Sequence, residues 1–587
     1  MLGNRFPLPY AGVQSNISLS TDVSGIPALT IGPNNQVYFA AAMKGTYNQS
    51  GFPTPFPLNI TTITPDGTQF LYNIVVGNYT AEATNQNVAT IFGTRNYYSF
   101  FNSANVNDTT KLDSLGEFWP YTGYQLQGTT NDSSPSIAVG PDLEMYIAYV
   151  TTSQIPERTN MSNVPSFCGC SNQGSSDIVV ARLTNQSRTV KAGPATTENA
   201  ANLVTTADWR IQDATVNSCA DETGPKLAID RTNQFLYMVH QTNYQILCFT
   251  VTGQDPNIVL SCIDLETGVV VWREAQTGVN SSGQTRAPAV AVDTLGGICV
   301  AAEITGPMTG GRDLSGSTVG VDVVKFQQVS SAPGVYAGRS RSWVLSQFVS
   351  LNPTTPGRSN TQPTIACDPV TGTILLAFVT TGELPGQTRS VGPGQRDLVV
   401  VTMKADGSNV RVQQGGVFNP DSRPYMTASA PYAAADPYGN FYLSVNIVEL
   451  TAPNVNNVLL FKILKNGNTS WSYANGTLMA DAYALAGGMP TTNAPNSVFP
   501  GEVNHVFVPV PAVYSQTPIA AGNGYFCTAT VTNNAQDVSP TESGYPGSNG
   551  LALAYFKEAL YYLNETAFNY ITINKSICSC GAGECSC

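Results

Sequence analysis

Histidine is scarce in this chain, and the two histidines stand far apart in the sequence. His240 and His505 each lie in an apolar stretch typical of a strand, where a lone imidazole is more often a satisfied core residue than a catalytic base. The sequence has no His-Glu-x-x-His pair for zinc, no Gly-x-Ser-x-Gly nucleophile turn and no glycine-rich phosphate loop. We therefore expect no catalytic residues, no cofactor and no metal site.

The cysteines are the residues best suited to covalent or metal chemistry. Cys578, Cys580, Cys585 and Cys587 form two Cys-x-Cys pairs at the end of the chain, and Cys168-Gly-Cys170 lies in a loop rich in Ser, Asn and Gly. Such thiolates could wrap a thiophilic metal. Structural zinc prefers Cys-x₂₋₄-Cys spacing, however, so we favour disulfides, either within the tail or from it to another loop or chain.

Five of the other cysteines lie near or within predicted strands. Cys248 and Cys262 flank a predicted hairpin turn and could face each other across it, so they are a further candidate disulfide. Cys299, Cys367 and Cys527 stand in apolar strands, and we interpret them as buried thiols.

Asn-x-Ser/Thr sequences mark candidate glycosylation sites throughout the chain. One interpretation is a glycan-coated surface; the other is chance, because Asn, Ser and Thr are abundant here. Both interpretations remain open. The candidates are Asn16, Asn48, Asn59, Asn78, Asn107, Asn131, Asn160, Asn185, Asn280, Asn468, Asn475, Asn564 and Asn574.

An internal repeat in the sequence predicts the strands that position these residues. Trp119, Trp209 and Trp272 each precede a proline by 16 residues, and Trp343 precedes one by 20. Seven copies over the whole chain predict a repeat architecture. Each proline opens a phrase close to Pro-x-Ile-Ala-x-Asp, at Pro135, Pro225, Pro288 and Pro363, with weaker copies at Pro27, Pro431 and Pro511.

Each copy predicts one blade of four strands. Runs of Val, Ile, Tyr and Phe bounded by Gly, Pro, Asn and Asp are typical of strands. The small residues of the phrase suit an inner strand near an axis, and the tryptophan suits an outer strand packed between blades. The aspartates that end the phrase are expected to cap tight turns with their side chains. They are Asp230, Asp293, Asp368 and Asp436.

We predict an all-β fold: a β-propeller of seven four-stranded blades, because radial repetition leaves only short, protected sheet edges. The propeller is expected to span residues 27–565. Residues 1–26 form an N-terminal extension along an outer edge or toward a neighbouring subunit, and residues 566–587 form a Cys-rich tail. A solenoid of stacked β-units is the alternative, but it would need capping repeats.

The composition limits the partners. The net charge is −12, the isoelectric point is near 4.7, and charged residues make up only 11%, against roughly 25% in ordinary globular domains. With no basic run to bind phosphates, nucleic acid is not an expected partner. No apolar segment is long enough for a secretory leader or a membrane span, so we expect neither. A polar surface of few charges is typical of extracellular or virion proteins, which is the predicted location.

The repeat resembles the SBBP-type β-propeller repeats of bacteria and of surface or virion-associated proteins of giant DNA viruses. The shared pattern runs from Trp272 and Gln276 to Pro288-Ala-Val-Ala-Val-Asp293, and again from Trp343 and Gln347 to Pro363-Thr-Ile-Ala-Cys-Asp368. The resemblance covers about residues 20–480. It implies a structural or adhesive module with no established active site.

A second resemblance is to quinoprotein dehydrogenases, whose blades repeat Asp-x-x-Thr-Gly-x-x-x-Trp. The pattern occurs once, from Asp264 to Trp272, and the adjacent-cysteine motif of that family is absent because a glycine separates Cys168 from Cys170. The Ser-x-Asp-x-Gly-x-Thr-Trp box of sialidases is absent too. We therefore predict that the protein is not an enzyme, and that pyrroloquinoline quinone and calcium would give no alcohol oxidation.

The predicted function is a non-enzymatic structural component of an extracellular assembly or virus particle, with itself or other particle proteins as partners. The alternative is a glycan- or receptor-binding propeller with a site at one face, built from Tyr-rich loops such as residues 95–101. A quinoprotein-like dehydrogenase is the least favoured hypothesis.

Overall fold

Strands form nearly all of the regular structure, which confirms the all-β prediction. In the described part of the chain the one helical element is a short 3-10 turn, η2 (Leu345–Gln347), and no helix is long and apolar enough to cross a membrane. The computed structural model describes residues 13–14, 20–48, 59–61, 73–79, 90–93, 132–152, 176–189, 201–212, 215–218, 220–230, 232, 234–243, 256–312, 317–328, 339–389, 395–414, 426–449, 452–463, 469–474, 477–479, 516–523, 525–532 and 550–557.

The strands pair mainly with their neighbours in sequence, in antiparallel sets that follow one another along the chain. The first set is β2 (Ser20–Ile31), β3 (Val37–Asn48), β4 (Asn59–Thr61), β5 (Asn73–Tyr79) and β6 (Thr90–Gly93). The second is β7 (Asp132–Val139), β8 (Met145–Thr151), β9 (Asp177–Thr189) and β10 (Ala201–Ile211). The third is β11 (Glu222–Asp230), β12 (Phe235–Thr242), β13 (Asn257–Asp264) and β14 (Val270–Glu274).

The middle of the chain holds two sets that a short parallel pairing of β17 with β19 joins into one sheet. They are β15 (Thr285–Val292), β16 (Ile298–Ile304), β17 (Ser317–Gln328) and β18 (Arg339–Val344), followed by β19 (Arg358–Cys367), β20 (Ile374–Thr380), β21 (Asp397–Met403) and β22 (Arg411–Gln414).

The last strands form two more sets. One is β23 (Met426–Ala435), β24 (Phe441–Glu449), β25 (Ala452–Ile463), β26 (Thr469–Ala474) and β27 (Thr477–Met479). The other is β28 (Ile519–Gly522), β29 (Tyr525–Thr532) and β30 (Gly550–Lys557), with the N-terminal strand β1 (Val13–Gln14) at its outer edge. The expected strand at Pro511 lies outside the described residues.

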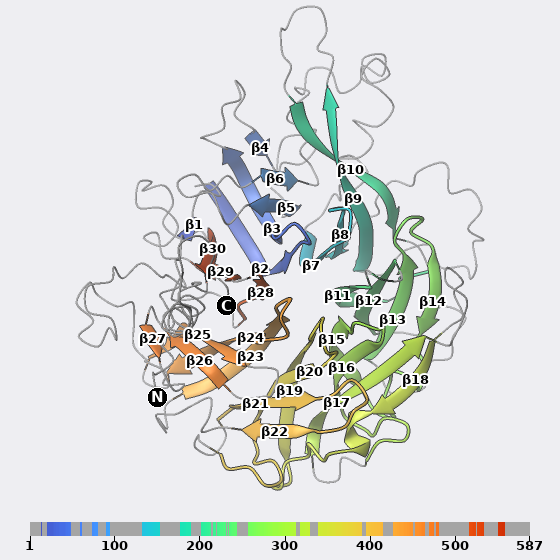
Figure 1. The fold of residues 1–587 in the computed structure, drawn as a ribbon, viewed down its shortest axis with the longest axis vertical. Helices are drawn as coiled ribbons and strands as arrows, with labels where there is room; N and C mark the ends of the chain where they lie inside the picture. Colours follow the sequence, from blue (N-terminus) through green and yellow to red (C-terminus); the bar gives the residue numbers. More distant parts are fainter. Residues whose placement is uncertain are drawn as a thin grey trace, which may run out of the picture.

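The first strand of each set lies beside the first strand of the next. β2 contacts β7, β7 contacts β11, β11 contacts β15, and the order continues through β19 and β23 to β28, which contacts β2. We call these seven the inner strands. Figure 1 shows them facing a common centre, with the later strands of each set farther out.

Apolar side chains pack between neighbouring sets rather than within a single core. Tyr237 and Leu260 of the third set, for example, share a buried cluster with Val300 and Phe326 of the set that follows. Similar clusters join the other consecutive sets from the first through the set that begins with β23. Each strand set therefore buries both faces of its sheet only when a neighbouring set packs against each face.

The repeated tryptophans hold these interfaces together, as the sequence predicts for Trp209, Trp272 and Trp343. Trp209, on β10, donates its indole N–H to the carbonyl of Leu265 in the next set, at 3.0 Å. Trp343, on β18, donates in the same way to Ala405, at 3.2 Å. The ring of Trp272 meets that of Phe326 edge-on, with centroids 5.6 Å apart. Trp119 lies outside the described residues.

The aspartates of the repeated phrase cap turns, which confirms that prediction. The Asp293 carboxylate accepts hydrogen bonds from the backbone N–H groups of Leu295 and Gly297. Asp436 accepts from the N–H groups two and four residues ahead, while Asp230 and Asp368 accept from the N–H group two residues ahead. These bonds fix the ends of the inner strands β11, β15, β19 and β23.

Each inner strand from β2 to β23 is kinked by a bulge at the start of the repeated phrase. The antiparallel register shifts beside every repeat proline, as between Thr223 and Lys226 or between Arg286 and Ala289. Just before four of the prolines the backbone takes a positive φ, and at three of these positions the residue is not glycine: Ser134, Ala287 and Gln362. Such strained, recurrent bulges re-aim side chains at functional sites.

The structure also bears on the expected segment boundaries. β2 begins at Ser20, so one continuous strand crosses the boundary expected between residues 26 and 27. The tail, residues 566–587, lies outside the described residues.

Candidate binding cavity

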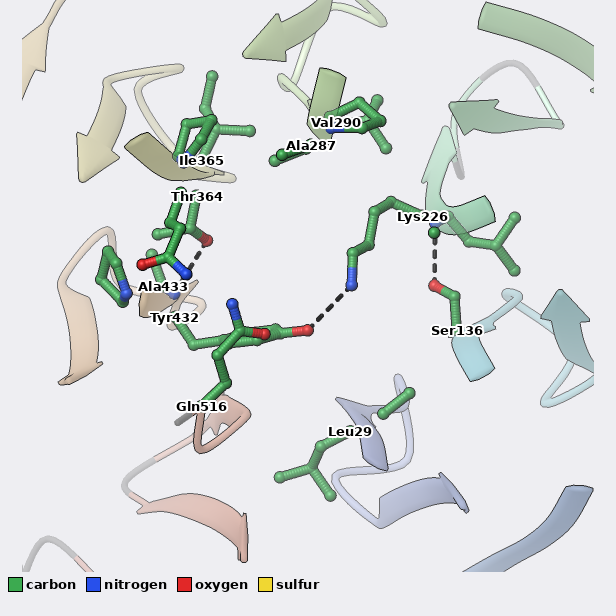
Figure 2. Close-up of a pocket in the computed structure, with 18 of the residues that line it drawn as sticks. Leu29, Ser136, Lys226, Ala287, Val290, Thr364, Ile365, Tyr432, Ala433 and Gln516 are labelled. Atoms are coloured by element: carbon green, nitrogen blue, oxygen red, sulfur yellow. Dashed lines mark hydrogen bonds between the residues drawn. The ribbon is translucent and has the colours of Figure 1, made fainter. Parts of the chain in front are cut away.

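A cavity of about 460 Å³ opens where the inner strands meet. The bulges of these strands line it, so prolines and positive-φ residues from several sets surround one space (Figure 2). Its wall comprises Ala28, Leu29, Pro135, Ser136, Ile137, Thr223, Gly224, Lys226, Leu227, Gln241, Ala287, Pro288, Ala289, Val290, Glu303, Gln362, Pro363, Thr364, Ile365, Pro431, Tyr432, Ala433, Gln516 and Ile519.

One position of the repeat, the residue directly after the proline, supplies the variable chemistry of this wall. In most sets it is small: Ala28, Ser136, Ala289 and Thr364. In β11 it is Lys226, and in β23 it is Tyr432, both half-buried in the cavity. Two repeats thus place a large polar side chain where the others place a small one.

Lys226 and Tyr432 meet across the cavity. The ammonium donates a hydrogen bond to the phenol oxygen at 3.0 Å, and Figure 2 shows the two side chains extending toward each other from different inner strands. The same ammonium lies 5.5 Å from the ring centre. A group so near the oxygen and so far from the centre sits at the hydroxyl end of the ring.

The two small hydroxyl residues have a different task. Ser136 accepts a hydrogen bond from the backbone N–H of Leu227 at 3.0 Å, and Thr364 accepts one from Ala433 at 3.2 Å (Figure 2). In both cases the acceptor stands on one inner strand and the donor on another. These hydroxyls tie inner strands together and thereby fix the position of the cavity wall.

Glu303 is the one carboxylate among the described residues of the wall, and both of its oxygens are engaged. Arg286 donates to one oxygen at 2.8 Å as an ion pair, and the backbone N–H of Gln362 donates to the other at 2.7 Å. The charge of Glu303 is therefore already balanced by Arg286. Hydrolysis of glycosidic bonds usually requires two carboxylates, and the described wall presents only this one.

A separate buried acidic pair lies between the second and third sets. The Glu222 carboxylate is fully buried and accepts hydrogen bonds from the backbone N–H of Ser218, at 2.8 Å, and from the Ser218 and Thr242 hydroxyls. Burial raises the pKa of Glu222 to about 7, and nearby Asp177 adds to the effect. Burial also raises the pKa of Asp177, to about 6. The described residues contain no cluster of three or more His, Cys, Asp or Glu placed to hold a metal.

Glu222 should make the protein less stable as pH rises. Its folded pKa exceeds the ordinary value of 4.5, so its favourable contribution is complete below pH 4.5 and is lost as pH rises to about 7. Glu222→Gln should therefore gain stability relative to the natural protein between pH 5 and pH 8, by up to about 3 kcal/mol. Thermal unfolding at both pH values measures the gain. The exposed Glu266→Gln is the control; an equal response in both variants would contradict the prediction.

The histidine prediction is correct in part. His240 is fully buried on β12, as expected for a core residue. Within the part of the chain that the structure describes, neither ring nitrogen has a hydrogen-bond partner, so it is not the satisfied residue that was expected. Burial, followed by the nearby charge of Arg273, lowers the pKa of His240 to about 3, so the ring stays neutral in the core. His505 lies outside the described residues.

The cysteine predictions need one correction. Cys299 and Cys527 are buried free thiols, as expected, and Cys367 is a free thiol that is half-buried. Cys262 is also a fully buried free thiol, so the structure does not support its predicted bridge to Cys248. It stands in the middle of β13, opposite Tyr237, and burial raises its pKa to about 12. The remaining candidate disulfide cysteines lie outside the described residues: Cys168, Cys170, Cys248, Cys578, Cys580, Cys585 and Cys587.

Asn280 is wrongly predicted as a glycosylation site. It is 1% exposed, its amide N–H₂ donates to the carbonyls of Ile258 and Ala275, and its oxygen accepts from the Ile258 N–H. Asn217 clamps Ile178 in the same way one set earlier. Asn280 therefore belongs to the repeat scaffold. The structure describes no other candidate side chain, and residues 95–101 also lie outside the described part.

No protein-family model matches this chain, and no curated protein matches it. Similar solved structures include a protein of unknown function from Dyadobacter fermentans, with 9% identity, TM-score 0.37 and coverage of 94% of this chain and 99% of that one. The NanB sialidase of Streptococcus pneumoniae has 10% identity and TM-score 0.31 over 95% and 71%. The α-L-arabinanase of Penicillium chrysogenum has 10% identity and TM-score 0.31 over 73% and 93%.

These comparisons correct the predicted function. Two of the similar structures are a sialidase and an arabinanase, which contradicts both the predicted structural role in a particle and the prediction that the protein is no enzyme. Nothing in them supports the resemblance to SBBP repeats or giant-virus proteins. Because these TM-scores lie below 0.5, they assign no activity to this chain, and the function must be argued from the cavity.

Proposed function

We propose that this protein binds a glycan in the cavity between its inner strands, and that the strand sets are seven blades of a closed β-propeller. The observation that carries the binding proposal is the Lys226–Tyr432 pair, which spans the cavity with a 3.0 Å hydrogen bond. The series of contacts between inner strands returns from β28 to β2, and this supports closure of the ring. The pairing of β1 with β30 supports a last blade that contains strands from both ends of the described chain.

The chemistry of the wall suits a sugar. Saccharides present C–H faces that pack on an aromatic ring and hydroxyls that need directional partners, and Tyr432 places a half-buried ring and its hydroxyl in the wall. Gln241, Gln362 and Gln516 add side-chain amides to the wall. Amides donate and accept at once, so they can match a sugar hydroxyl in either role.

The scaffold holds this wall in place before any ligand arrives. The bulges fix where each side chain begins, and the inter-strand bonds of Ser136 and Thr364 hold neighbouring strands at constant spacing. A preformed site loses less entropy on binding than one that must order itself.

Titration with a panel of neutral and acidic oligosaccharides, followed by calorimetry, tests the proposal. Tyr432→Ala should weaken binding of any oligosaccharide by about tenfold or more, because it removes both the ring and the hydroxyl. Tyr438→Ala is the matched control, since Tyr438 is 59% exposed in a turn outside the cavity wall. Unchanged affinity in Tyr432→Ala, or no binding by any member of the panel, would overturn the proposal.

A further inference from the structure

We propose that the glycan carries an anionic group, a carboxylate or a sulfate, which the Lys226 ammonium binds directly. This inference rests on the proposed glycan site and names its ligand class. It follows from the charge balance of the cavity, from the hydrogen-bond donors that remain there and from the position of Lys226 in the repeat.

The ammonium of Lys226 is the unbalanced charge in the described wall. Glu303 is paired with Arg286, and the other buried lysine of this region, Lys325, is paired with Asp293 at 2.5 Å. In the part of the chain that the structure describes, the recorded partner of Lys226 is the neutral Tyr432 hydroxyl. A half-buried cation without a counter-ion is costly, and an anionic ligand would offset that cost.

The Lys226–Tyr432 pair lies in the cavity wall and keeps hydrogen-bond donors for a ligand. An ammonium has three N–H groups, and one of them is used on the Tyr432 oxygen. Because that oxygen accepts from Lys226, its own O–H is left to donate elsewhere. Two N–H groups and one O–H are thus left to bind a ligand, and carboxylate and sulfate oxygens accept such charge-assisted bonds well.

The repeat offers no structural need for a lysine here. Four other inner strands carry Ala, Ser or Thr at the same position and form the same bulge. A lysine that only bridged β11 to β23 would stabilise the empty protein without any preference among ligands. A lysine that binds an anion would make the protein prefer charged oligosaccharides over uncharged ones, and substitution of the lysine would abolish this preference.

Four oligosaccharide probes separate these cases: oligogalacturonate, its uncharged methyl ester, a neutral galacto-oligosaccharide, and the same galacto-oligosaccharide sulfated. Calorimetry should give tighter binding of an anionic probe than of its uncharged counterpart, by about tenfold to a hundredfold. The two pairs distinguish carboxylate from sulfate as the source of the charge. The preference should shrink in about 0.5 M NaCl, as expected for an ion pair that solvent can reach.

Two variants complete the experiment. Lys226→Gln should bind a charged probe and its uncharged counterpart equally, while Lys226→Arg should keep the preference; thermal unfolding confirms that both variants fold. Equal binding of charged and uncharged probes by the natural protein, or a preference that survives in Lys226→Gln, would overturn the anion proposal and leave the glycan site standing. Failure of all four probes to bind would overturn the glycan site itself.

Discussion

Lys325→Met should lower the free energy of unfolding by about 3–5 kcal/mol, because it leaves a buried carboxylate without its partner. The side chains of Lys325 and Asp293 are both fully buried, and their charged atoms lie 2.5 Å apart. Lys325 also donates to the Ala405 carbonyl at 2.6 Å, so the pair connects β17 with the set that follows. Urea or thermal denaturation measures the loss.

The double variant Lys325→Met/Asp293→Asn tests the cause. Asn can still accept the turn bonds from Leu295 and Gly297 but carries no charge, so most of the lost stability should return. Equal destabilisation by the single and double variants would show that lost packing of the lysine stem is responsible instead.

Gly268→Ala should cost about 2–5 kcal/mol, the sum of a backbone penalty and an overpacking penalty. Gly268 has a φ of +71°, which L side chains rarely adopt, and a Cβ there would lie 2.6 Å from the indole ring of Trp209. The clash would push Trp209 away from the Leu265 carbonyl that it binds. Thermal unfolding and tryptophan fluorescence should both report the change.

Gly386→Ala separates the two penalties. Gly386 has nearly the same φ, +73°, but a Cβ there would have nothing within 4 Å. It should cost only the backbone part, about 1–2 kcal/mol. Equal losses in the two variants would mean that Trp209 moves freely, and its role at the interface between the second and third sets would then be wrong.

Much of the fold was predictable because the repeat encodes it locally. A proline, a small apolar strand and an aspartate are sufficient signals for a strand and its capped turn, and Asp293 and Asp436 behave as expected. The bulges were not predicted, since nothing in Ala287 or Gln362 announces a positive φ. That conformation is imposed by strand pairing, which a local pattern does not contain.

The cavity was missed for a related reason. No prediction used the residue after each proline, although Lys226 and Tyr432 differ from the small residues of the other copies. This difference was a usable signal, because a residue that differs from its counterparts in the other copies of a repeat is a candidate functional residue. Asn280 shows the converse: its sequence matches a glycosylation signal, but only tertiary packing reveals that its amide is buried.

The pairing of β1 with β30 brings Val13 beside Ala554. During synthesis, β1 leaves the ribosome long before its partner β30, because all the other described strands lie between the two in sequence. The pairing of β1 with β30 therefore forms late, because contacts between residues so far apart in sequence form slowly. Until β30 emerges, β1 lacks its partner, and its unpaired edge is an open template for another strand.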